Sequence, residues 1–237
     1  MTTRLSPAHS AGTIVPLNEP TAKVDRRAER RASRREQSRT EILDAAETVF
    51  GEDGIRDGSL RRIAELSGFS AAALYLFFED KQQILAETLT RRADEWNSTI
   101  QGVAEGDSDP LDKLHEIIDA STRFFDERPQ FRLLLRHIRG GPAVTGPALA
   151  EFATEVDGRY FEILKRVATI VKDGQSAGRI RKGNERSIAH LYSVMVNEFV
   201  LLATSSAEAN VGTLTAEEFH EFVDGALRAP SAGRQKS

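Results

Sequence analysis

The segment from Arg39 to Lys81 contains two short amphipathic patterns separated by a tight break, and this spacing constrains the fold more than any other feature. Ser59 can cap a first short helix, Ser67-Gly68 breaks it, and Ser70 can cap the next. Two short helices joined in this way form a helix-turn-helix, whose second helix enters the major groove of duplex DNA. The segment therefore predicts a DNA-reading unit, with a helical hairpin inside a core as the alternative.

The rest of the chain repeats apolar residues at three- and four-residue steps, and no stretch sustains the alternation of a strand. Breaks are expected near Gly51 and Gly54, at Gly102–Asp109 and before Pro129. Asp109-Pro110 has the form of a helix start. The expected fold is therefore all-α, with about nine helices.

Charge is distributed unevenly along the chain. The net charge is −4, but residues 26–39 hold seven arginines against two glutamates, a net charge of +5 that leaves −9 for the remainder. If this run is helical, its arginine pairs share a face where like charges repel until an anion neutralises them. DNA would supply that anion. We therefore expect contacts to DNA from Arg34, Arg35 and Arg39, with a solvated basic tail as the alternative.

Several classes of protein are disfavoured by what the sequence lacks. There are no cysteines, which excludes disulfides, thiolate zinc sites and cysteine nucleophiles. Five histidines without helical pairing, and the absence of phosphate-loop, nucleophile-elbow and dinucleotide motifs, predict no metal, no cofactor and no enzymatic activity. No signal-peptide core and no run of roughly 20 apolar residues is present. A cytoplasmic protein without membrane association is expected.

Residues from Arg39 to Leu85 closely resemble the N-terminal domain of TetR-family transcriptional regulators. The resemblance implies a flexible basic arm over residues 1–33, a three-helix reading head over 34–96, a helical ligand-binding and dimerisation domain over 97–228 and a tail over 229–237. The matching residues are Ile42-Leu43, Ala45-Ala46, Phe50, Gly54, Ser59, Arg62, Ile63-Ala64, Gly68-Phe69-Ser70, Leu74-Tyr75, Phe78 and Lys81.

By this resemblance, Ala71–Ala73 face the bases from a recognition helix that begins at Ser70. Alanine cannot hydrogen-bond a base edge and offers only apolar contact, for example to a thymine methyl group. The resemblance gives the base contact to Arg61, and an arginine favours guanine. In the family, the position of Phe77 often holds a polar residue that contacts phosphate, so Phe77 is expected to pack against other side chains instead. For Tyr75 a phosphate contact is expected, with packing as the alternative. With the phosphate positions of the family, the expected DNA contacts are Arg34, Arg35, Arg39, Ser59, Arg61, Ser70, Ala71, Ala72, Ala73, Tyr75 and Lys81.

The resemblance also implies a homodimer in which the last two helices of each subunit form a four-helix interface. The patterns Ile188–Ala203 and Phe219–Leu227 suit that role because their apolar surface exceeds what one subunit easily covers, with packing inside a monomer as the alternative. The helices between residues 110 and 173 would enclose a pocket for a small-molecule effector. Candidate lining residues, each with core packing as the alternative, are Trp96, His115, Phe125, Tyr160, Tyr192 and Asn197.

Together these features predict a DNA-binding transcriptional regulator. The resemblance implies a repressor that an effector releases from an inverted-repeat operator, with an activator as the alternative. Two reading heads about 34–36 Å apart fit successive major grooves. A ligand that prefers a wider separation would lower operator affinity. One alternative is an architectural or weakly specific DNA-binding protein, which the three alanines favour. The other is a helical enzyme, for which the sequence offers no converging titratable groups.

Overall fold

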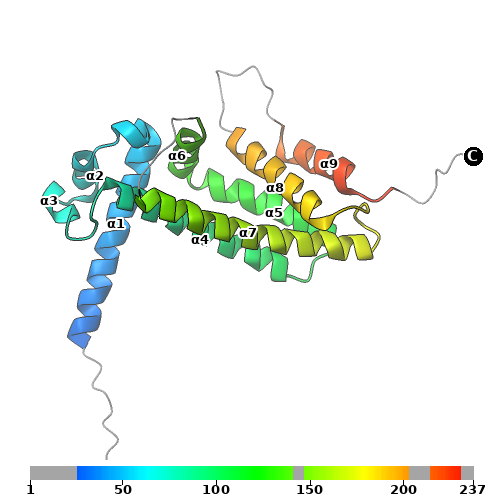
Figure 1. Cartoon of the computed structure of the whole chain (residues 1–237), viewed down its shortest axis with the longest axis horizontal. Coiled ribbons are helices and arrows are strands. Elements are labelled where there is room, and N and C mark those ends of the chain that lie inside the picture. The colour runs from blue at the N-terminus through cyan, green and yellow to red at the C-terminus, as the bar shows by residue number, and fades with distance from the viewer. Residues whose placement is uncertain (1–25, 141–146, 203–213, 231–237) are drawn as a thin grey trace, which may run out of the picture. The chain divides into compact units, whose positions relative to one another are not determined.

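The computed structural model describes residues 26–140, 147–202 and 214–230 (Figure 1). The chain divides into two units, residues 1–37 and 38–237. The all-α prediction is confirmed, since the described residues form nine helices, with one isolated antiparallel bridge between Ile180 and Arg228. The helices are α1 (Arg26–Asp57), α2 (Leu60–Ser67), α3 (Ala71–Leu74), α4 (Lys81–Glu105), α5 (Pro110–Asp126), α6 (Pro129–Gly140), α7 (Pro147–Ser176), α8 (Glu185–Leu202) and α9 (Ala216–Leu227).

The first unit contributes the start of α1. Residues 26–33, expected in a flexible arm, are helical, and every residue from Arg26 to Gln37 is exposed. The part of the expected arm before Arg26 lies outside the described residues. An exposed helix with this many arginines presents positive charge on its surface.

Short-range chemistry produces the helix-turn-helix in the second unit. The Oγ of Ser59 accepts a hydrogen bond from the amide of Arg62 at the start of α2, and the Oγ of Ser70 accepts one from Ala73 at the start of α3. Between them, Gly68 has a φ of 75°, a left-handed conformation that glycine adopts without a side-chain clash. The predicted caps and break are therefore confirmed.

The core of the reading head continues into the C-terminal helices. Phe50, Ile63 and Leu74 are fully buried, and the same apolar cluster includes Phe124 of α5 and Phe131 of α6. The boundary expected at residues 96 and 97 falls inside α4, which runs without interruption from Lys81 to Glu105. A change in the C-terminal helices can therefore be transmitted to the head through continuous packing.

A second core joins α5, α7, α8 and α9. Helix α7 lies alongside α4 and α8 (Figure 1), and α5 packs on α7, α8 and α9. The end of α9 is held by two backbone hydrogen bonds, from Arg181 to Leu227 (2.8 Å) and from Ala229 to Arg179 (2.9 Å). Within the described ranges, none of the helices combines the length and apolar character that crossing a bilayer requires.

Candidate functional site

The helix-turn-helix presents an exposed surface around α3. Leu74 points into the core, whereas Ala71 and Ala72 are exposed and the side chains of Tyr75 and Leu76 are 59% and 70% exposed. Adjoining exposed apolar side chains can mark a surface that contacts a partner. Leu76 was not among the residues that the sequence pattern singled out.

Arg61 extends from the exposed side of α2. Its Nε donates to Oε1 of Glu65 at 2.8 Å, one helical turn further on. The hydrogen bond and the negative charge of Glu65 raise the pKa of Arg61, so the guanidinium stays charged. An ion pair this exposed is weak in water, so the guanidinium can exchange Glu65 for another acceptor.

Arg39 has a structural role that the sequence did not indicate. Its Nη1 donates to the carbonyl oxygen of Phe77 at 2.8 Å, its Nη2 pairs with the carboxylate of Glu87, and its Cζ lies 4.4 Å from the ring centroid of Phe78. The side chain is three-quarters buried. These contacts hold α1 against the segment that follows α3, and they engage the charge that was expected to contact DNA.

The remaining polar candidates keep hydrogen-bonding capacity. Lys81 donates one hydrogen bond from Nζ to the carbonyl of Arg56 at 2.9 Å. Burial lowers the pKa of Lys81, and the charge of Asp57 opposes that shift. An ammonium has three donors, and the capping hydroxyls of Ser59 and Ser70 can still donate while they accept from the backbone. Phe77 packs edge-on against Phe69, with ring centroids 5.9 Å apart, as expected for a packing residue.

A cavity of about 190 Å³ lies among α4, α5, α6, α7 and α8. Four of the six ligand candidates line it: Trp96, Phe125, Tyr160 and Asn197. The other lining residues are Leu89, Arg92, Ala93, Phe131, Leu135, Arg159 and Ile163.

The other two ligand candidates lie elsewhere. Tyr192 is fully buried and donates its hydroxyl to the carbonyl of Leu114, and burial raises its pKa well above the ordinary value. His115 contacts Asp224 of α9 at 2.9 Å and stacks on His220, with ring centroids 4.7 Å apart. Tyr192 is therefore a core residue, and His115 joins α5 to α9.

Both cavity arginines are paired with carboxylates. Nε of Arg92 lies 2.6 Å from Oε2 of Glu47, and its Nη1 lies 2.9 Å from Glu95. Nε of Arg159 lies 2.6 Å from Oδ1 of Asp94. Burial opposes the charge of Arg92, but the hydrogen bonds and charges of the two glutamates outweigh it and raise its pKa. The cavity wall therefore carries no excess of positive charge.

Helix α6 connects the cavity to the reading head. Its side chains Phe131 and Leu135 line the cavity. On α1, a Cβ added to Gly51 would lie 2.5 Å from the backbone oxygen of Gln130, and Nε2 of His137 lies 3.1 Å from the carbonyl of Gly51. A shift of α6 on ligand binding would therefore act directly on the helix that carries the head.

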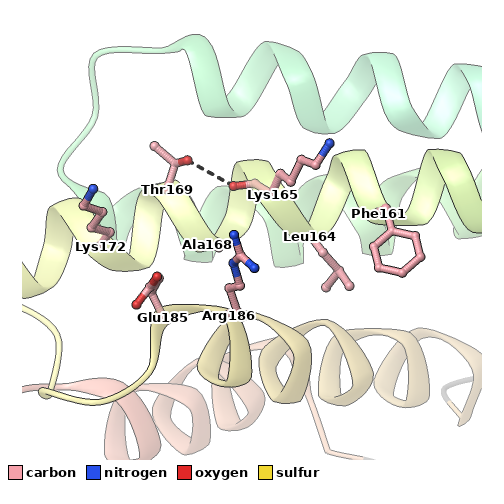
Figure 2. A pocket seen from close by; sticks show the side chains of 8 residues that line it. All are labelled: Phe161, Leu164, Lys165, Ala168, Thr169, Lys172, Glu185 and Arg186. Carbon is pink, nitrogen blue, oxygen red and sulfur yellow. Dashed lines mark hydrogen bonds between the residues drawn. The ribbon is translucent and has the colours of Figure 1, made fainter.

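A groove of about 400 Å³ follows α7 and the start of α8 (Figure 2). Its apolar residues are Phe161, Leu164 and Ala168. Figure 2 shows the hydroxyl of Thr169 donating to the carbonyl of Lys165, a 3.0 Å hydrogen bond within α7. The charged lining residues are Lys165, Lys172, Glu185 and Arg186. The groove is basic, whereas the arginines of the cavity wall are paired with carboxylates. In the part of the chain that the structure describes, no cluster of three potential metal ligands occurs.

Comparison with known proteins agrees with this arrangement. The family described as "Bacterial regulatory proteins, tetR family" matches residues 42–88, which run from the core of α1 through α3 into α4. This helix-turn-helix belongs to the TetR family. A curated relative, the HTH-type transcriptional repressor KstR2 of Mycolicibacterium smegmatis, is 31% identical over 90 residues, which cover 38% of this chain and 44% of that repressor. The chain therefore matches less than half the length of this relative.

Solved structures share the fold over most of the chain. The fatty acid degradation regulator FadR from Bacillus halodurans is 18% identical, with a TM-score of 0.64 over 80% of this chain and 99% of that chain. AibR in complex with isovaleryl coenzyme A and operator DNA is also 18% identical, with a TM-score of 0.62 over 81% and 99% of the two chains. At this identity the likeness shows the TetR-type fold.

Proposed function

We propose that the protein is a homodimeric, cytoplasmic transcriptional repressor of the TetR type and not an enzyme. The observation that carries this proposal is the capped helix-turn-helix, whose core is continuous with helices that line a largely apolar cavity. A small molecule in that cavity would be the effector. Residues 34–96 are assigned to the reading head and residues 97–228 to effector binding and dimerisation, with α4 shared between them.

DNA reading is assigned to the exposed surface around α3 and α2. Arg61 is the base-reading residue, because its weak ion pair can be exchanged for the N7 and O6 acceptors of guanine. Ser59, Ser70, Tyr75 and Lys81 contact phosphate, and the three alanines approach thymine methyl groups. Arg39 positions the head and does not read DNA.

Dimerisation is assigned to α8 and α9. Leu191 and Val194 of α8 and Phe222 of α9 are exposed, although the buried sides of both helices already pack on their own subunit. A second copy would cover these apolar side chains through a two-fold interface. Two heads held in this way would contact an inverted repeat, and an effector that favours a different head separation would release it.

The proposal predicts a strong preference for one palindromic sequence. The full-length protein would be used to select sites from random duplexes, and the affinities for the selected and scrambled sites would be compared at one physiological salt concentration. We expect the selected site to be bound at least about 1,000-fold more tightly. Equal affinity would instead support the architectural protein, the second candidate, which the alanine-rich α3 favours.

Arg61→Ala should relax this sequence preference. The variant loses the bidentate contact to guanine, so discrimination at that base pair should fall about tenfold or more. Glu65→Gln is the matched control, because it removes the ion-pair partner and leaves the guanidinium in place. If Arg61→Ala kept full discrimination, base reading would have to be assigned to another residue or to DNA shape.

Replacing both Arg34 and Arg35 with glutamine should weaken the salt dependence of DNA binding. Each phosphate contact contributes about 0.9 to the slope of log affinity against log salt concentration, so two lost contacts should reduce the slope by roughly 1.8. The control is the double variant Lys172→Gln/Arg186→Gln, which removes the same charge from the α7–α8 groove. An equal change in both double variants would show a general charge effect.

A further inference from the structure

We infer that the cavity takes a small, uncharged and largely apolar effector, about the size of a one-ring aromatic alcohol, and not an anionic acyl thioester. This inference rests on the proposed function, since it names the class of molecule that would act as the effector. It is carried by the volume of the cavity, the pairing of its arginines and the chemistry of its walls.

The volume limits the part of a ligand that the cavity can bury. The cavity measures about 190 Å³. A protein cavity of about 150 Å³ holds benzene, whereas drug-sized ligands occupy roughly 300–1,000 Å³. A single ring with a short substituent therefore fills the space, whereas most of a coenzyme A thioester would lie outside it.

The charges around the cavity disfavour an anion. Arg92 is held by Glu47 and Glu95, and Arg159 is held by Asp94. A ligand carboxylate would have to displace one of these protein carboxylates and leave it without its cation. This is costly at Arg92, because the Glu47 side chain is only 7% exposed and its remaining charge would be poorly solvated. A neutral ligand leaves all of these pairs intact.

The walls favour an aromatic ligand. The ring centroids of Trp96 and Phe125 lie 6.1 Å apart, and Phe125 stacks on Phe131 at 5.9 Å with the rings nearly parallel. Leu89 and Leu135 add aliphatic surface. Aromatic pairs add attraction beyond simple burial of apolar area, so a ring placed against this wall gains from the same interaction.

Two side chains offer a polar contact at the cavity. Tyr160 lies 3.2 Å from Nδ1 of His190 through its hydroxyl, and burial raises its pKa, so the phenol stays neutral. Among the residues that the structure describes, no hydrogen bond is found for the side-chain amide of Asn197. An amide provides both donor and acceptor atoms, which matches a hydroxyl group on the ligand.

The only tryptophan of the chain, Trp96, gives a direct readout. Benzyl alcohol and benzoate form the test pair, because they share a ring and differ in charge. Binding to the full-length protein would be measured by calorimetry and by Trp96 fluorescence. We expect saturable binding of benzyl alcohol, at least tenfold weaker binding of benzoate, and no Trp96 response to isovaleryl coenzyme A.

Two variants locate the binding. Ala93→Phe places a ring in the cavity and should abolish benzyl alcohol binding, whereas Ser98→Phe, at an exposed position of the same helix outside the cavity, should leave it unchanged. Asn197→Leu should remove the preference for benzyl alcohol over toluene. Thermal unfolding of each variant would establish that the protein is folded.

Three results would overturn the inference. Benzoate or isovaleryl coenzyme A could bind as tightly as benzyl alcohol, benzyl alcohol could bind the Ala93→Phe variant normally, or no neutral one-ring probe could bind at all. The regulator proposal is tested by a separate measurement. It would fail if the ligand-free protein bound selected and scrambled duplexes with equal affinity.

Discussion

Replacing Gly51 with alanine should destabilise the protein, although alanine is normally the better residue in a helix. The added Cβ would lie 2.5 Å from the backbone oxygen of Gln130 and 3.1 Å from its carbonyl carbon. Because these are backbone atoms, no side-chain rotation can relieve the clash, and α6 must move away from α1. Overpacking of this kind costs about 1–3 kcal/mol.

Thermal or denaturant unfolding would measure this loss. For a chain of this size, each kcal/mol corresponds to roughly 2–4 °C in Tm. Gly102→Ala is the matched control, because Gly102 lies within α4 and a Cβ there would meet no atom within 4 Å. The control should gain about 0.5–1 kcal/mol from the lower backbone entropy of alanine. Equal stabilisation of both variants would contradict the close approach of α6 to α1.

The same substitution should affect DNA binding without touching the reading surface. Moving α6 displaces Phe131 and Leu135 from the cavity wall and changes the support of α1. We therefore expect Gly51→Ala to weaken both operator affinity and the response to the effector, under conditions where the variant is still folded. If operator affinity and the response to the effector were both unchanged, the connection between the cavity and the reading head would have to run through α4 alone.

Local chemistry explains which parts of the fold were predictable from the sequence. Ser59, Gly68 and Ser70 act within three or four residues of their own position, so the helix caps and the break follow from residue type and spacing. The start of α5 at Asp109-Pro110 is another local signal, and the structure confirms it, since Asp109 accepts a hydrogen bond from the amide of Leu111 at 3.0 Å. The family resemblance supplied the identity of the unit.

Long-range contacts explain what the sequence could not indicate. Arg39 belongs to a basic run, but its partners Phe77 and Glu87 lie 38 and 48 residues further along the chain. Arg92 looks like a solvent-facing charge until Glu47, 45 residues earlier, is placed beside it. Charged side chains of this kind reveal their roles only when the fold brings their partners together.

The cavity was partly predictable for a related reason. Polar or aromatic residues on apolar stripes either line a cavity or pack in a core, and sequence spacing does not separate these two outcomes. Trp96, Phe125, Tyr160 and Asn197 fall on facing helices and line the same space. His115 satisfies the same pattern, but its partner Asp224 lies 109 residues away on α9. Whether such a residue lines the cavity or packs in a core therefore depends on which helix faces it in the folded protein.

Leu191→Glu should convert the proposed dimer into a monomer. The Leu191 side chain is 62% exposed on α8, and Val194 and Phe222 provide further exposed apolar surface on the same two helices. A carboxylate introduced at Leu191 would be brought close to its own copy across a two-fold interface and would be buried without a cation. Since Leu191 is exposed in the single chain, the fold of each subunit should persist.

Sedimentation would measure the mass of the particle in solution and so its oligomeric state. Operator binding would measure the effect of losing the dimer on DNA affinity. Linking two binding units raises apparent affinity by about 100- to 10,000-fold, so separated heads should lose operator affinity to that extent. Leu66→Glu provides the control for the oligomeric state only, because Leu66 is 55% exposed and outside the proposed interface, but lies on α2 in the DNA-reading head. The control should remain dimeric. If Leu191→Glu also remained dimeric with full operator affinity, the interface would have to lie elsewhere, and the open groove along α7 would be the next surface to test.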